Sequence, residues 1–78
     1  MRILIAEDEV KVATHMRKGL VEAGYAVDVA VDGSEALWLA ESNPYDALVL
    51  DVMMPGTGGI SVVRQLRRNG VRAPVILV

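Results

Sequence analysis

Three carboxylates follow two apolar runs of the chain. Glu7 and Asp8 come directly after the run 3–6, and Asp51 comes directly after the run 47–50. Carboxylate oxygens are the ligands that Mg²⁺ prefers, whereas zinc and copper favour nitrogen and sulfur. If the three side chains lie close together, their mutual repulsion raises the pKa of some of the carboxyl groups, unless a cation neutralises the negative charges. The residue types therefore predict a Mg²⁺ site in which one carboxylate acts as a nucleophile toward a phosphoryl group.

Short apolar runs alternate with stretches of helical periodicity. The runs 3–6 and 47–50 contain no polar residue, which is typical of strands buried on both faces of a parallel sheet. Val12, Met16 and Leu20 recur every fourth residue, which predicts a helix that ends before Gly24. The expected elements are strand 3–6, a helix through 12–21, strand 25–31, helix 34–41, strand 47–50, a helix through 60–66 and strand 74–78.

The order βαβαβαβ predicts an α/β fold with an all-parallel, doubly wound sheet and helices on both faces. In the flavodoxin-like strand order 2-1-3-4-5, strands one and three are neighbours at the point where strand order reverses. Ligands of such sheets bind there, outside the carboxyl ends of the strands. The topology therefore predicts that Glu7, Asp8 and Asp51 share one cleft.

Composition narrows the class of protein. With 78 residues, the chain can form at most one small domain. Because 53% of the residues are hydrophobic, the chain is not a disordered tail. A net charge of −2 with mixed signs gives no reason to expect nucleic-acid binding by this segment. There is no cysteine, so disulfides and thiolate metal sites are excluded. No apolar stretch is long enough for a membrane span, so we expect a cytoplasmic protein without a membrane partner.

Two motifs carry a resemblance to a known family. The strand 3–6 ends in the acidic pair, and Asp51 is followed by Met54, Pro55 and Gly59 at fixed spacings. With Asp32-Gly33 between them, these motifs resemble the CheY-like receiver domain of two-component response regulators. The segments 2–4, 53–55 and 72–76 are similar to the OmpR/PhoB type, which are transcriptional regulators with a winged-helix DNA-binding domain.

The resemblance implies a role for each site residue. Asp51 would accept a phosphoryl group from a sensor histidine kinase and thereby switch the DNA-binding activity of the parent protein. Asp8 and Asp51 would bind Mg²⁺ directly, and Glu7 would bind it directly or through water. The backbone carbonyl of Met53 would supply a further ligand. Enzyme activity would be limited to the domain's own phosphorylation and dephosphorylation.

The resemblance also sets an expected extent. Residues 1–78 would form the N-terminal two-thirds of a receiver domain, and the family's switch Thr or Ser and its conserved Lys would follow Val78. Contacts with DNA would belong to a C-terminal winged-helix domain of the parent protein. We expect the isolated fragment to be inactive or weakly active, and to self-associate through the exposed strand 74–78.

Two other function classes remain open at this stage. A nucleotide-binding α/β enzyme would need a glycine-rich loop after the first strand, whereas Glu7-Asp8-Glu9 is acidic and contains no glycine. An unphosphorylated interaction or oligomerisation module with the same fold is the stronger alternative, and Mg²⁺ affinity would discriminate it. The acidic pair alone could also be a favourable charge at a helix N-terminus.

Several remaining residues are expected to be structural. We predict that His15 is a solvated surface residue and that Trp38 is partly buried packing. The side chains of Met53 and Met54 are expected to pack, because thioethers bind Mg²⁺ poorly. A basic group is expected to be a solvated face near a helix C-terminus rather than a DNA contact; it comprises Arg64, Arg67, Arg68 and Arg72.

Overall fold

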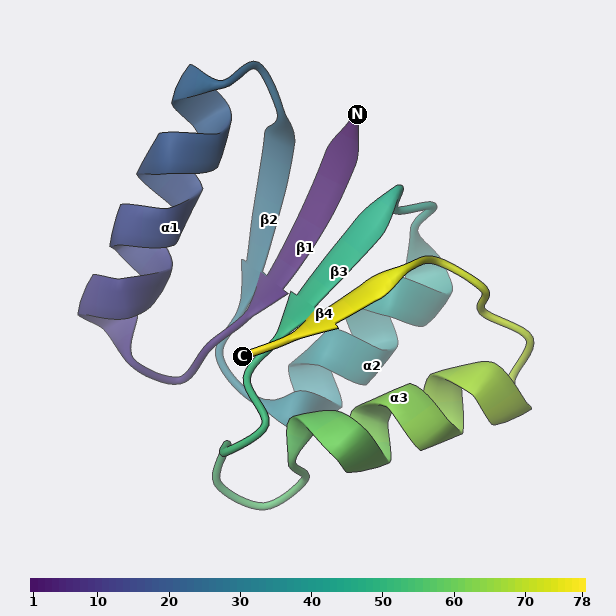
Figure 1. Cartoon of the computed structure of the whole chain (residues 1–78). Helices are drawn as coiled ribbons and strands as arrows, with labels where there is room; N and C mark the ends of the chain where they lie inside the picture. The colour runs from purple at the N-terminus through teal and green to yellow at the C-terminus, as the bar shows by residue number, and fades with distance from the viewer.

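The chain adopts the predicted βαβαβαβ order, and the computed structural model describes all of residues 1–78 (Figure 1). The elements are β1 (Arg2–Ala6), α1 (Val10–Glu22), β2 (Ala26–Ala30), α2 (Gly33–Ser42), β3 (Ala47–Leu50), α3 (Gly59–Arg68) and β4 (Val75–Leu77). Every strand pair is parallel and the strand order is β2-β1-β3-β4. This arrangement confirms the flavodoxin-like prediction for the four strands.

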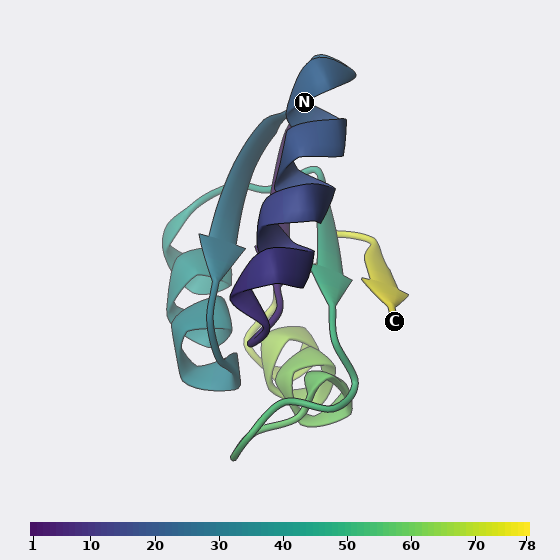
Figure 2. The same cartoon turned by 90° about the vertical axis from the view of Figure 1, so that its left-hand side faces the viewer.

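The sheet lies between α1 on one side and α2 with α3 on the other (Figures 1 and 2). Alternate residues of β1 point to opposite faces, so Leu4 and Ala6 join the larger core under α2 and α3. Ile3 and Ile5 join a smaller cluster on the α1 side, together with Val27. Burial on both faces explains why β1 contains no alternating polar residue.

The register places the carboxyl ends of the central strands together. Ala6 pairs with Leu50 of β3 and with Ala30 of β2. The residues that follow continue the ladder, because the Asp51 N–H donates to the Ala6 carbonyl at 3.0 Å. The Glu7 N–H donates to the Ala30 carbonyl at 3.0 Å. The backbone of both acidic segments is therefore tied to the sheet rather than left in free loops.

A polar network closes the opposite end of the sheet. The Tyr45 hydroxyl donates to Asp28 Oδ2 at 2.7 Å, and the Arg2 guanidinium donates to the same oxygen at 2.9 Å. The Arg2 guanidinium also lies 5.0 Å from the centre of the Tyr45 ring. These contacts join β1, β2 and the segment that leads into β3, far from the three carboxylates.

Helix α2 begins as the sequence predicts. The Asp32 side chain accepts a hydrogen bond from the Glu35 N–H at 2.8 Å, which satisfies one of the free amides of the first turn. At the other end, the Asn43 N–H and side-chain amide both donate to the Leu39 carbonyl. Asn43 therefore ends the helix directly before the proline at position 44.

Predictions about three helix faces are wrong. Trp38 is 67% exposed rather than partly buried, and Val12, the first residue of the apolar periodicity 12-16-20, is 39% exposed. Ile60, the first apolar residue of the helix predicted through 60–66, is 47% exposed. The buried residues are instead Ala36 and Ala40 in α2, and Val62 and Leu66 in α3. Trp38 and Ile60 each lie two positions from a buried residue, a rotation of about 200° around the helix axis. Both side chains therefore point into solvent.

Strand β4 forms one edge of the sheet. Its backbone ladder extends through the Val78 N–H, which donates to the Leu50 carbonyl at 2.9 Å. The side chains of Ile76 and Val78 are 58% and 56% exposed, although both are apolar. A large hydrophobic area therefore remains accessible at this edge. None of the helices has the length and apolar character needed to span a membrane.

Candidate functional site

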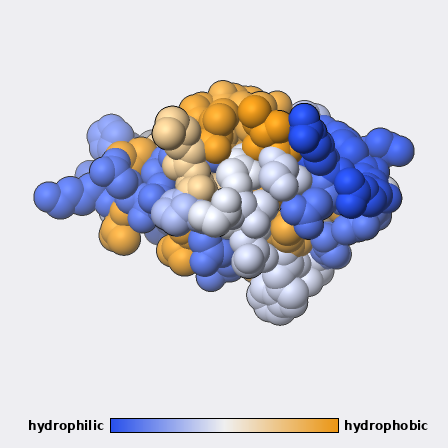
Figure 3. Space-filling view, turned by 90° about the horizontal axis from the view of Figure 1, so that it is seen from below, coloured by the Kyte–Doolittle hydropathy of each residue, from blue (hydrophilic) through white to orange (hydrophobic).

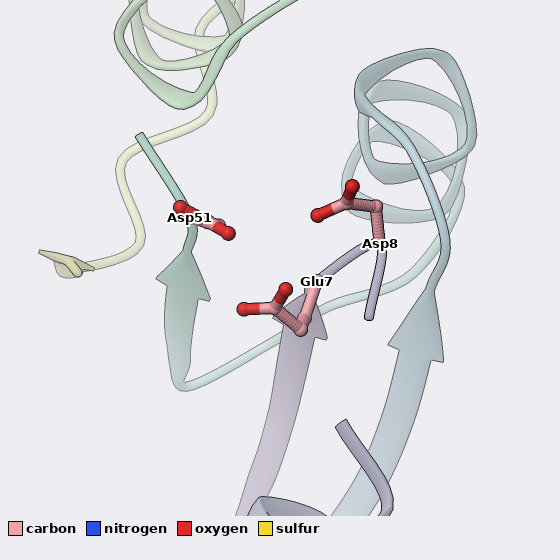
Figure 4. Close-up of side chains that lie close together, drawn as sticks. All are labelled: Glu7, Asp8 and Asp51. Carbon is pink, nitrogen blue, oxygen red and sulfur yellow. The ribbon is translucent and has the colours of Figure 1, made fainter. Parts of the chain in front are cut away.

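The structure brings Glu7, Asp8 and Asp51 together at the carboxyl ends of β1 and β3. Each offers a carboxylate oxygen, and these oxygens all lie within 4.8 Å of one another. In Figure 4, the side chains of Glu7 and Asp8 point toward Asp51 from the neighbouring strand end. The juxtaposition that the strand order predicted is thus present.

Glu7 is the buried member of this carboxylate cluster. Only 7% of the residue is exposed, and it is the single charged residue in the core. Burial raises the pKa of the Glu7 carboxyl, and the nearby negative charge of Asp51 raises it further. A hydrogen bond from the Glu9 N–H to Glu7 Oε1, 3.1 Å long, acts in the opposite direction and lowers this pKa. Ionised Glu7 is therefore unfavourable here unless a positive charge joins the cluster.

Asp51 is partly accessible to solvent, and its orientation is fixed locally. Its Oδ1 accepts a hydrogen bond from the Met53 N–H at 2.9 Å. Asp51 is partly exposed to solvent, since its burial is intermediate. Apart from the Met53 N–H and the neighbouring Glu7 carboxyl, the Asp51 side chain has no hydrogen-bond partner, so a carboxylate oxygen is available for a metal ion or an electrophile.

Two glycines allow the loop after Asp51 to turn back against its own start. A Cβ on Gly59 would lie 2.5 Å from the Asp51 carbonyl oxygen, closer than real Cβ contacts. A Cβ on Gly58 would lie 2.8 Å from the Val52 carbonyl oxygen. The Gly59 N–H donates to that same Val52 carbonyl at 3.2 Å. Helix α3 therefore begins directly beside the acceptor residue.

The two methionines of this loop have different environments. Met54 is 7% exposed and belongs to the core under α2 and α3, which confirms its predicted packing role. Met53 is 83% exposed, so the prediction that its side chain packs is wrong. Its backbone N–H, which no sequence pattern singled out, is the group that holds Asp51. Ligation of Mg²⁺ by its carbonyl stays a prediction.

The other polar candidates lie outside the carboxylate cluster. His15 is exposed on α1, as expected. Arg64, Arg68 and Arg72 are exposed and none of them forms an ion pair, while Arg67 donates to the Val71 carbonyl at 2.8 Å. The view from below shows hydrophilic surface on both flanks of this end of the molecule, with a hydrophobic patch at the upper margin (Figure 3).

Curated proteins with similar sequences include transcriptional regulators. The chain is 52% identical over 68 residues to the transcriptional activator protein IrlR of Burkholderia pseudomallei, which covers 87% of this chain and 30% of IrlR. It is 41% identical over 78 residues to the transcriptional regulatory protein CusR of Escherichia coli, covering 100% of this chain and 34% of CusR. The chain thus spans about a third of these relatives, whose names agree with the resemblance to OmpR/PhoB-type regulators.

Solved structures agree in fold. The receiver domain of the Francisella response regulator 1452 matches with a TM-score of 0.94 and 41% identity, covering 97% of this chain and 63% of that one. The response regulator TrrA of Thermotoga maritima, solved in complex with Mg(2+)-BeF, matches with a TM-score of 0.92 and 38% identity, covering 97% and 66%. The model of the response regulator receiver domain matches residues 3–78. Fold, acidic cluster and relatives therefore agree, and the chain belongs to the receiver-domain family of response regulators.

Proposed function

We propose that Asp51 accepts a phosphoryl group from a sensor histidine kinase in a Mg²⁺-dependent reaction, and that this switches the transcriptional activity of the parent protein. One observation carries the proposal. The carboxylate oxygens of Glu7, Asp8 and Asp51 lie within 4.8 Å of one another. Asp51, at the end of β3, is more exposed to solvent than Glu7, at the end of β1.

The donor set fits Mg²⁺. Three carboxylates provide hard oxygen ligands, and buried Glu7 gains most from a neighbouring positive charge. Asp8 and Asp51 would hold the ion directly, Glu7 directly or through water, and the Met53 carbonyl would complete the protein ligands. Bound Mg²⁺ would supply charge stabilisation for the oxygens of the transferring phosphoryl group.

Asp51 performs the covalent step in this proposal. Its free carboxylate oxygen attacks the phosphorus of a phosphohistidine, a P–O bond forms, and the P–N bond breaks with its electron pair going to the imidazole nitrogen. The Met53 N–H holds Asp51 Oδ1 and so limits rotation of the carboxylate during the attack. Water later releases phosphate from the acyl phosphate. The chain is therefore a phosphoacceptor and not a general enzyme.

The kinase partner is supported by a related structure. A second structure of TrrA, in complex with the histidine kinase ThkA, is also similar to this chain. It has a TM-score of 0.89 and 38% identity, and the match covers 97% of this chain and 66% of TrrA. We place the reaction in the cytoplasm, where the parent protein would bind DNA through a separate winged-helix domain. The described chain has a net charge of −2, which does not favour direct contact with DNA.

We also propose that the 78-residue chain self-associates through β4. This edge strand presents unpaired backbone groups, and the neighbouring apolar side chains of Ile76, Leu77 and Val78 are 58%, 43% and 56% exposed. An apolar edge strand is a template for pairing with a second chain. Sedimentation at increasing concentration should show growing mass, and Ile76→Lys should suppress it; a monomer at every concentration rejects this interface.

Phosphorylation is tested directly with a small phosphodonor. Incubation of the protein that carries this chain with acetyl phosphate and Mg²⁺ should add one phosphoryl group, detected by mass spectrometry of the intact protein. Asp51→Asn should not be labelled, and Asp46→Asn, a surface change outside the cluster, should be labelled normally. Equal labelling of Asp51→Asn rejects the site, and absence of both labelling and Mg²⁺ binding favours the unphosphorylated interaction module.

A further inference from the structure

The first residue of α2, Gly33, contacts the loop that follows Asp51. A Cβ on Gly33 would collide with the carbonyl oxygen of Thr57, and it would lie 2.8 Å from the Thr57 Cβ and 3.2 Å from the Thr57 carbonyl carbon. Real Cβ atoms essentially never approach other atoms closer than 3.0 Å. We infer that Gly33 is a positioning residue, which sets where the loop 52–58 lies relative to Asp51; its link to phosphorylation rests on the function proposed above.

The need for glycine at this position comes from space and not from backbone conformation. The glycines with positive φ are Gly24, Gly56 and Gly70, and Gly33 is not among them. Gly33 is buried and is the first residue of α2, directly after the capping residue Asp32. Because its φ does not require glycine, the close approach of Thr57 explains why no side chain fits at this position.

The contact leads to Asp51 by a short path. Thr57 is followed by Gly58 and Gly59, and Gly59 packs so closely on the Asp51 carbonyl that a Cβ would lie 2.5 Å from it. From the other end, the loop begins with Met53, whose N–H holds Asp51 Oδ1 at 2.9 Å. A displacement of Thr57 is therefore transmitted to both the backbone and the carboxylate of the acceptor residue.

Helix α2 is the more rigid side of this contact. Asp32 caps its first turn with a hydrogen bond of 2.8 Å to the Glu35 N–H, and Ala36 and Ala40 are buried against the sheet. Thr57 lies in a loop between Pro55 and α3 that has no regular secondary structure. When a methyl group is added at position 33, the loop must therefore move and the helix stays in place.

Gly33→Ala tests the inference, and Gly19→Ala is the matched control. Gly19 also lies in a helix, but a Cβ there has no heavy atom within 4 Å. We expect the metal-free Gly33→Ala chain to keep its circular dichroism spectrum while the amide NMR resonances of Met53 and of residues 57–59 shift. Its Mg²⁺ affinity, measured by calorimetry, should fall on the order of tenfold, as for other residues that orient metal ligands. Gly19→Ala should change neither property.

Each outcome decides the inference. Unshifted loop resonances together with wild-type Mg²⁺ affinity in folded Gly33→Ala overturn it. If Gly33→Ala does not fold, Thr57→Gly replaces it, because this change removes the Thr57 Cβ from the contact with Gly33 and keeps the backbone. The amide resonance of Met53, four residues away, should then shift and Mg²⁺ binding should weaken, and an unchanged Met53 amide with unchanged Mg²⁺ affinity overturns the inference. Absence of Mg²⁺ binding in the wild-type chain would reject the proposed function instead, since the metal-free loop shifts still test the role of Gly33.

Discussion

The backbone N–H of Asp51 donates a hydrogen bond of 3.0 Å to the carbonyl oxygen of Ala6, the residue directly before Glu7. This single bond joins the acceptor segment to the acidic pair although the two are far apart in the chain. It also means that the carboxylates are brought together by the folding of the sheet itself. Folding therefore concentrates negative charge at this end of the sheet, which lowers the stability of the metal-free chain.

Asp51→Asn should stabilise the metal-free chain at neutral pH. The substitution removes a negative charge beside buried Glu7, whose pKa is raised by burial and by that charge, and we expect a gain on the order of 1 kcal/mol in the free energy of unfolding. Urea denaturation in the presence of a chelator measures it. Mg²⁺ should then stabilise the wild type more than the variant.

The control for this measurement is Glu22→Gln, which removes an exposed negative charge at the end of α1. We expect this control to change the free energy of unfolding by less than about 0.5 kcal/mol. If Asp51→Asn is destabilised in the chelator, or if Mg²⁺ stabilises it as much as the wild type, the three carboxylates do not repel one another as described.

Tyr45→Phe should make stability depend less on pH. The Tyr45 hydroxyl, with Arg2 beside it, holds the pKa of the Asp28 carboxyl below its usual value of 3.8, so this stabilisation is present above pH 3.8 and is lost as the pH falls through the lower folded value. Burial and the contact with Asp28 raise the pKa of Tyr45 to about 12, so stability is lost again as the pH rises from 10.0 through that value.

We expect Tyr45→Phe to cost about 1 kcal/mol between these limits, a modest value because the Asp28 side chain is 39% exposed and solvent screens it. Urea midpoints at neutral pH and in acid measure the difference, which should shrink in acid. Tyr25→Phe is the control, since the Tyr25 hydroxyl has no hydrogen bond within the chain and should change little. A constant difference at every pH would contradict the proposed pairing.

Leu66→Ala and Ile60→Ala should separate the two faces of α3. Leu66 is fully buried at 0% exposure, and its truncation should cost about 3 kcal/mol because it leaves a cavity under the helix. Ile60 is 47% exposed, and its truncation should cost about 1 kcal/mol or less. Thermal denaturation of both variants is sufficient. A similar loss of stability in both variants would mean that Ile60 is buried like Leu66, and would reject this orientation of α3.

Trp38 should behave as a surface residue in solution. It is 67% exposed and is the single tryptophan of the chain, so its fluorescence reports on this position alone. We expect emission close to that of the unfolded chain and efficient quenching by iodide in the folded state. Trp38→Ala should change the free energy of unfolding by less than about 0.5 kcal/mol. Protection from iodide would show that a partner or a second chain covers α2.

The fold and the members of the carboxylate cluster could be predicted from the order of residue types alone. Short unbroken apolar runs are typical of strands buried on both faces, and acidic residues directly after such strands lie at the same edge of a parallel sheet. The start of the helix predicted over 34–41 was likewise correct to within one residue, because its cap, from the Glu35 N–H to Asp32, joins residues close together in the chain. These features are local patterns whose consequences follow from general rules of packing.

Which helix faces are buried, and what the acceptor loop contacts, could not be predicted from local patterns. A rotation of about 200° separates Trp38 from Ala36, and no local pattern distinguishes an exposed from a partly buried tryptophan when both neighbours are apolar. The approach of Gly33 to Thr57, and the hydrogen bond from the Met53 N–H to Asp51, likewise depend on how α2 and the loop pack after the sheet has formed. These two contacts join segments that are distant in sequence, and they use backbone groups that every residue carries. Residue type alone therefore does not predict them.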